Sequence, residues 1–184
     1  MDVFFTDNSS DYAKNTYKNI KISNFKDEFV LGPYNQFHLL SDPKRVGFMF
    51  ARYKFVAKML NGHKNVLEIG CQEGFGTIIV AKSVEKVVAI DFYKPHIESA
   101  NKNVKKFVNN IDFLNHDIIS EPVKNIFDSA YSLDVLEHID PKQEDIYMRN
   151  ILDSLTADGV LIIGIPSLES QVYASKESKK GHIN

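Results

Sequence analysis

The sequence predicts an α/β fold with a doubly wound, mainly parallel sheet, and three observations lead to this prediction. Short β-branched runs alternate along the chain with stretches of helical periodicity. The first run passes directly into a glycine-rich turn, Gly70 to Gly76, and the second ends at the acidic residue Asp91. Because strands that alternate with helices need right-handed crossovers, we expect parallel strands with helices on both faces of the sheet.

The first predicted helix covers residues 43–60, where apolar side chains recur at helical spacing. Asp42 is placed to cap this helix, and Pro43 suits its first turn. In the preceding residues 1–42, polar stretches alternate with aromatic residues, and the segment contains residues that favour turns. We expect them to form an N-terminal extension that can fold over a site as a lid.

A short buried strand over residues 65–69 follows and runs straight into Gly70. After the glycine turn, the periodicity predicts a helix over residues 77–83. The β-branched run at residues 86–90 is typical of a strand that is covered on both faces. Pro95 can begin the next helix, which is expected to continue to Phe107 with one apolar stripe.

The second half of the chain repeats the alternation of strand and helix. Gly159 is expected to turn the chain from the last helix into the last strand. The predicted elements are strands over residues 111–114, 127–133 and 160–165 and a helix from Asp140 and Pro141 to about Leu155. Residues 167–184 form a polar tail that bears several lysines.

The composition fits one soluble globular domain. The chain has 184 residues, of which 43% are hydrophobic and 25% charged, and this argues against disorder and against a fibrous protein. A formal net charge of -2 supplies no broad basic field, so nucleic acid is not expected as a partner. A single cysteine, Cys71, and the absence of a long apolar run favour a cytoplasmic protein without a membrane span.

Ligands in such sheets bind outside the carboxyl ends of the strands, so the glycine turn and Asp91 are candidate site residues. A nicotinamide dinucleotide is the first ligand to consider, because its fingerprint is a glycine turn followed by an acid about twenty residues later. Counted from Gly70, that fingerprint needs further glycines where this chain has Gln72 and Phe75. The spacing therefore argues against a dinucleotide, and the alternative that the glycines only permit tight packing stays open.

The segment Glu68 to Gly76 resembles the first motif of the class I S-adenosylmethionine-dependent methyltransferases, which has an acid at the end of strand one and spaced glycines. Glu68, Gly70 and Gly74 match this motif. Gln72 departs from the usual middle glycine, so the turn must tolerate a side chain there or point it outward. The resemblance implies a Rossmann-like domain over residues 43–166 with S-adenosylmethionine as its cofactor.

The resemblance continues at the later strand ends. It implies that Asp91 accepts hydrogen bonds from both ribose hydroxyls, that Asp117 accepts from the adenine amino group, and that Phe92 packs on the adenine face. Asp91 and Asp117 are also consistent with turn caps, and Phe92 with a core aromatic residue. The segment 131–138 is similar to the one that borders cofactor and substrate. The expected cofactor-binding residues are Glu68, Gly70, Cys71, Gly74, Asp91, Phe92, Asp117, Ile118, Ser132 and Leu133.

A base is needed if the methyl acceptor is a hydroxyl, and His138 has the side chain that suits this work. On a helical turn Asp134 would lie on the same face and could orient the ring or raise its basicity, and the alternative is a solvated pair without a catalytic role. His116 and Asp117 could join Asp134 and His138 around a metal ion, but the spacing fits no ligand signature, so no metal is expected. Cys71 is interpreted as a small buried residue without a nucleophilic role.

Family members normally finish with two more strands, which form an antiparallel hairpin beside strand five, and residues 166–184 cannot supply it. Residues 160–165 are then expected to form an exposed apolar edge, covered in a homodimer or exposed by truncation. The predicted function is methyl transfer to a small molecule or sugar-like metabolite. The alternative is a scaffold domain that binds the cofactor and transfers nothing.

Overall fold

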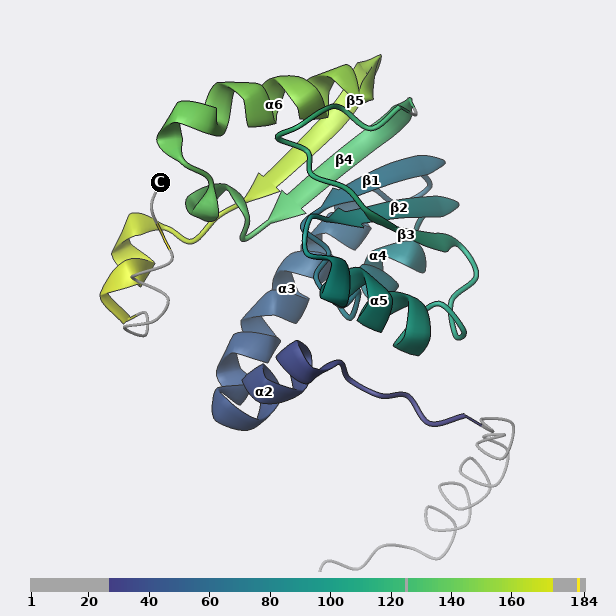
Figure 1. Cartoon of the computed structure of the whole chain (residues 1–184), viewed down its shortest axis with the longest axis vertical. Coiled ribbons are helices and arrows are strands. Elements are labelled where there is room, and N and C mark those ends of the chain that lie inside the picture. Colours follow the sequence, from purple (N-terminus) through teal and green to yellow (C-terminus); the bar gives the residue numbers. More distant parts are fainter. Residues whose placement is uncertain (1–26, 125, 174–181, 183–184) are drawn as a thin grey trace, which may run out of the picture. The chain divides into compact units, whose positions relative to one another are not determined.

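The computed structural model describes residues 27–124, 126–173 and 182 (Figure 1). The chain divides into two compact units, Met1–Val30 and Leu31–Asn184. Within the first unit only residues 27–30 are described, and they are exposed and lack regular structure. The second unit contains all the helices and strands of the described residues.

A five-stranded sheet in the order β3-β2-β1-β4-β5 forms the centre of this unit, and every neighbouring pair is parallel. The chain adds β2 and β3 on one side of β1 and then returns to add β4 and β5 on the other, so the direction of winding reverses between β1 and β4. Ligands bind at such a switch point in open α/β sheets. The strands are β1 (Asn65–Ile69), β2 (Lys86–Asp91), β3 (Ile111–Asn115), β4 (Phe127–Leu133) and β5 (Leu155–Gly164).

Helices cover both faces of the sheet, as the alternation in the sequence predicts (Figure 1). On one face, side chains of α3, α4 and α5 pack against the strands around Val56, Val80 and Ile97. On the other face, Tyr147 and Ile151 of α6 pack against β1, β2 and β4. These helices are α3 (Pro43–Met59), α4 (Thr77–Ala81), α5 (Lys94–Asn103) and α6 (Glu144–Asp153). The doubly wound α/β prediction is therefore confirmed.

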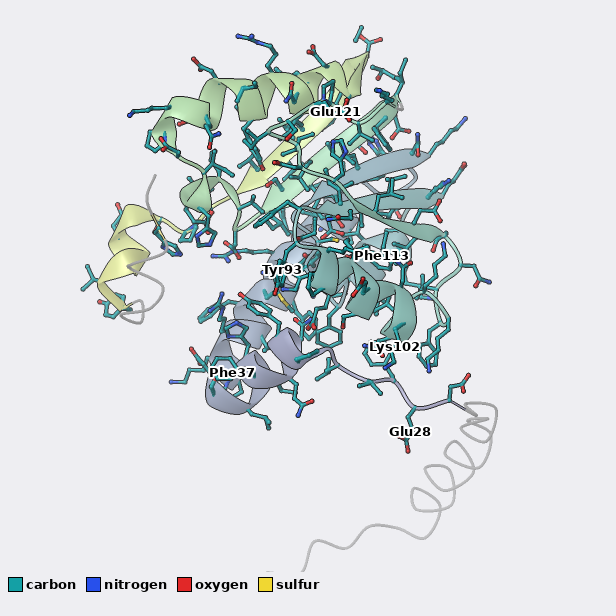
Figure 2. All side chains as sticks on the ribbon, viewed as in Figure 1. Glu28, Phe37, Tyr93, Lys102, Phe113 and Glu121 are labelled. Carbon is teal, nitrogen blue, oxygen red and sulfur yellow. The ribbon has the colours of Figure 1, made fainter. Side chains whose placement is uncertain are left out.

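Helix α2 (Pro33–Ser41) is the main element that the sequence does not predict. Phe37 points outward from this helix (Figure 2), and Leu40 is also exposed, so its apolar residues do not form a buried stripe. Pro33 occupies the first turn, but Gly32 provides no side-chain cap. The usual signals of a helix are therefore weak in this segment.

Several predicted boundaries also differ from the structure. The last helix is preceded by the short 3-10 helix η3 (Pro141–Gln143), and Asp140 caps that turn by accepting a hydrogen bond from the Lys142 amide at 2.9 Å. Helix α5 ends at Asn103 instead of Phe107. Strand β5 begins at Leu155, ahead of Gly159, and its pairing with β4 is irregular before it becomes continuous at Val160.

Strand β5 lies at the edge of the sheet and pairs, among the described residues, with β4 alone. Residues 27–124 and 126–173 contain no further strand beside it. A cavity of about 290 Å³ lies next to this edge, lined by Ala51, Arg52 and Phe55 of α3, by Leu133, and by residues 162–164 of β5. In the part of the polar tail that is described, residues Leu168–Tyr173 form the 3-10 helix η4.

None of the described helices combines the length and the apolar character that are needed to cross a bilayer.

Candidate active site

The glycine turn after β1 has three residues in the left-handed backbone region: Gly70 (φ 78°), Gln72 (φ 50°) and Gly74 (φ 74°). A Cβ atom on Gly70 would collide with the Val135 side chain, and one on Gly74 would collide with the Phe113 ring. Both glycines are therefore required by conformation and by close packing. Gln72 adopts the same conformation with a side chain, at a cost of about 1 kcal/mol, so the turn tolerates its departure from the family motif.

Asp91, at the end of β2, is fastened to this turn. Its Oδ2 accepts a hydrogen bond from the Gln72 amide at 2.9 Å, and its Oδ1 accepts one from the Tyr93 amide at 2.8 Å. A carboxylate offers about four acceptor directions, so these two bonds leave capacity for further hydroxyl donors. The residue is 6% exposed, and His96 Nδ1 also lies 3.6 Å from Oδ1. Asp91 therefore caps a turn, as one interpretation expects, and the two amide bonds do not use all of its acceptor directions.

Aromatic side chains gather beside Asp91. Phe92 is 75% exposed, which rules out the interpretation that it is a core residue. Tyr93 (Figure 2) is half exposed, and its ring lies 4.9 Å from the ring of His96. The His96 ring also lies 5.4 Å from the ring of Tyr34 in α2. A planar ligand that reached Asp91 would therefore find exposed aromatic surface next to it.

Asp117 and Ile118 follow the end of β3. Asp117 is exposed, and its carboxylate accepts hydrogen bonds from the Ile119 amide at 2.9 Å and the Ser120 hydroxyl at 3.1 Å, so it caps its own turn. The amide of His116 donates to the Asp91 carbonyl at 3.1 Å, which brings this loop to the end of β2. The Ile118 side chain is buried on the α6 face of the sheet.

Glu68 points into the protein and away from the exposed rim. Its Oε1 accepts a hydrogen bond from the Tyr53 hydroxyl of α3 at 2.8 Å, and the side chain is 1% exposed. Burial raises the pKa of Glu68 to about 7, although the hydroxyls of Thr77, Tyr53 and Tyr131 favour the charged form. The Glu68 carboxyl is thus bound within the core by Tyr53, and direct contact with a cofactor remains a prediction for it.

Cys71 and Ser132 are also buried. Burial and, to a smaller extent, the nearby charge of Glu68 raise the pKa of the Cys71 thiol well above its usual range, in agreement with its interpretation as a small core residue. The Ser132 hydroxyl lies 2.6 Å from the Tyr147 hydroxyl of α6, so its side chain is used within the core. Only the backbone atoms of Ser132 are therefore available to a ligand. Leu133, in contrast, lines the cavity beside α3 and β5.

Asp134 and His138 do not form the helical pair that the spacing suggests. Asp134 has a left-handed backbone (φ 55°), its amide donates to the Gly164 carbonyl at 2.8 Å, and its carboxylate pairs with Arg52 of α3. The 3-10 helix η2 (Leu136–His138) begins only after it. The expectation that the two side chains share a helical face is therefore wrong, because tertiary contacts hold Asp134 outside the helix. His138 as a base stays a prediction.

Two buried acids were missed by the sequence analysis. Glu73, in the glycine turn, accepts hydrogen bonds from the Asn35 amide at 2.9 Å, the Asn35 side chain at 3.0 Å and the Ser99 hydroxyl at 3.1 Å. It thereby fixes α2 and α5 to the turn. Glu137 lies in η2 beside His138, and burial raises the pKa of its carboxyl. The sequence offered one signal for each of these residues. Glu73 stands between glycines of the motif, and Glu137 directly precedes the candidate base His138.

Comparison with known proteins decides the family. A family model described as a methyltransferase domain matches residues 60–183, which is more than half of the chain. The chain belongs to this methyltransferase family. The prediction of a class I S-adenosylmethionine-dependent methyltransferase from the motifs at successive strand ends is confirmed at the level of the family.

Curated relatives and solved structures agree with this family. The methyltransferase domain is 30% identical over 109 residues to carboxy-S-adenosyl-L-methionine synthase of Helicobacter pylori, with 57% of this chain and 44% of the relative covered. It is 23% identical over 128 residues to ubiquinone biosynthesis O-methyltransferase of Rickettsia canadensis, with 66% and 53% covered. The chain thus spans about half the length of the curated relatives it matches.

Among solved structures, the N-methyltransferase NodS of Bradyrhizobium japonicum, in complex with S-adenosyl-L-homocysteine, superposes with a TM-score of 0.56 at 20% identity. The match covers 85% of this chain and 72% of NodS. At this identity the likeness shows the fold of the methyltransferase domain and does not identify its substrate.

Proposed function

We propose that the methyltransferase domain binds S-adenosylmethionine across the carboxyl ends of β1, β2 and β3 and transfers its methyl group to a small molecule. The observation that carries the proposal is the bond between Asp91 and the Gln72 amide, because it joins the two motifs at one rim of the sheet. In this position Asp91 would accept from the ribose hydroxyls, and exposed Phe92 would pack against the adenine ring. Asp117 would serve the adenine amino group from the neighbouring loop.

Methyl transfer from this cofactor requires mainly that the protein align the acceptor with the methyl group. The sulfonium group is already an activated methyl donor, so the domain has to position the acceptor and exclude water. The cavity next to Leu133 supplies a mostly apolar wall with one cation, Arg52, and its volume of about 290 Å³ falls near the lower end of the range for small-molecule sites. The curated relatives carry names from small-molecule metabolism, which supports a small or sugar-like metabolite as acceptor.

Replacing Asp91 with Asn tests cofactor binding without changing the shape of the side chain. We expect the variant to bind S-adenosyl-L-homocysteine at least tenfold more weakly in calorimetry, because hydrogen bonds to a charged acceptor contribute about 1.5–3 kcal/mol each. Asp112→Asn is the matched control, since Asp112 pairs with Lys86 and Lys105 outside the glycine turn. Wild-type protein that binds neither the cofactor nor this product at micromolar concentration would contradict the proposal.

The alternative of a non-catalytic scaffold domain has two supports: Gln72, and the lack of a strand beyond β5 within residues 126–173. Gln72 forms the left-handed turn that the motif needs, which weakens the first of these arguments. Transfer of a labelled methyl group from S-adenosylmethionine to any metabolite in a small-molecule mixture would eliminate the scaffold function.

We infer the remaining properties of the domain from composition. One buried cysteine and a net charge of -2 support a cytoplasmic protein that acts on small molecules without nucleic acid or membrane as a partner.

A further inference from the structure

Three potential metal ligands meet beyond the carboxyl end of β4. Glu137 and His138 belong to η2, and His182 comes from the far end of the sequence. One ligand atom from each side chain lies within 4.8 Å of the other two. The rings of His138 and His182 are 5.1 Å apart and inclined at 64°, so their edges approach one another. The fold therefore gathers two imidazoles and one carboxylate in one place.

The carboxylate of Glu137 provides a second, independent observation. This side chain is only 6% exposed, and neither of its oxygens has a hydrogen-bond partner within the described part of the chain. A buried carboxylate without a partner costs several kcal/mol, so such groups are normally paired or bound to a metal. Arg52, a nearby cation, forms its ion pair with Asp134. A divalent cation would supply the missing partner of Glu137.

We propose that Glu137, His138 and His182 bind one divalent transition-metal ion, with zinc as the reference ion. Metal bonds of 2.0–2.2 Å place ligand atoms about 3–4 Å apart, so small rotations of the side chains would close the present separation. Imidazole ligands favour zinc and its transition-metal neighbours over magnesium and calcium, which prefer oxygen. Three protein ligands leave a fourth coordination position open, as in catalytic zinc sites.

The role of this metal rests on the proposed function. A hydroxyl of the acceptor that occupies the open position would lose its proton to solvent more readily, because the ion lowers its pKa. The oxygen lone pair then forms the bond to the methyl carbon while the carbon–sulfur bond breaks, and its electron pair stays on the sulfur of S-adenosyl-L-homocysteine. In this arrangement His138 holds the ion and does not act as the base.

The test is zinc titration of the full chain after treatment with a chelator and its removal. We expect one zinc ion to bind per chain at micromolar concentration or below in calorimetry. Glu137→Gln, His138→Gln and His182→Gln should each weaken binding at least about tenfold, because each removes one of three ligands. His63→Gln is the matched control, since His63 lies before β1 beside Asp128 and away from this cluster.

Two outcomes would overturn the proposal: no stoichiometric zinc binding by the wild type, or binding that all three variants retain. If Glu137→Gln fails to fold, His182→Gln still decides, because His182 lies in the C-terminal tail. Binding of S-adenosyl-L-homocysteine to the metal-free wild type is measured in parallel. That binding tests the proposed function separately, so a failure of the metal site and a failure of the cofactor site are distinguishable.

Discussion

At the scale of single residues, Glu68 shows how a motif acid can serve the fold. Its carboxyl is buried and accepts a hydrogen bond from Tyr53, and burial raises its pKa from the ordinary 4.5 to about 7. Between these two values the folded chain holds a proton that the unfolded chain has released. This site therefore favours folding most below about pH 4.5, and its contribution falls as the pH rises to about 7.

Glu68→Gln removes this titration and keeps an oxygen that can accept from Tyr53. We compare the free energy of unfolding of the variant with that of the wild type. We expect this difference to change in favour of the variant by on the order of a few kcal/mol as the pH is raised from 4.5 to 8. Urea unfolding of both proteins across this range measures the difference, and titrations elsewhere cancel in the comparison. Equal pH dependence in the two proteins would contradict the raised pKa of Glu68.

Some residues were predictable because their roles are local. Gly70, Gly74 and Asp91 stand at fixed distances in the sequence, and that spacing predicted the glycine turn and the acid at the end of β2. Asp134 was not predictable in this way, because its conformation depends on the Gly164 carbonyl and on Arg52 from distant elements. The proximity of His182 to Glu137 was not predictable either, because it too depends on contacts between distant parts of the chain.

At the scale of the elements, strands were predicted best because buried parallel strands are short apolar runs between turns. Helix α2 was missed since Phe37 and Leu40 are exposed, and a polar contact between Asn35 and Glu73 joins it to the glycine turn. The start of β5 was missed because Leu155 to Gly159 form no continuous apolar run and pair irregularly with β4.

Strand β5 carries a prediction of its own. Residues 160–165 contain no charged side chain of the kind that protects natural sheet edges, and Val160 and Ile165 are exposed. We expect two copies of the chain to pair their β5 edges around a two-fold axis, since such an interface is self-complementary. Val160→Lys should shift the protein to monomer in light scattering, while Thr156→Lys, in the irregular part of the strand, should not. A monomeric wild type at tens of micromolar would contradict this pairing.

At the scale of the whole molecule, the order of the strands explains why distant motifs meet. Winding outward from β1 in both directions places the glycine turn, Asp91 and the segment after β4 at one rim of the sheet. The switch point between β1 and β4 would then separate the proposed cofactor side, next to β2 and β3, from the proposed acceptor side, next to α3 and β5. Glu137 and His138, the proposed metal ligands that follow β4, would belong to the proposed acceptor side.

A crystal structure of the full chain with S-adenosyl-L-homocysteine tests the central claim most directly. We predict the ribose hydroxyls within hydrogen-bond distance of the Asp91 carboxylate, the adenine ring against Phe92, and the sulfur atom directed toward the segment after β4. A ligand bound elsewhere on the molecule, with Asp91 engaged only by the Gln72 and Tyr93 amides, would contradict the account.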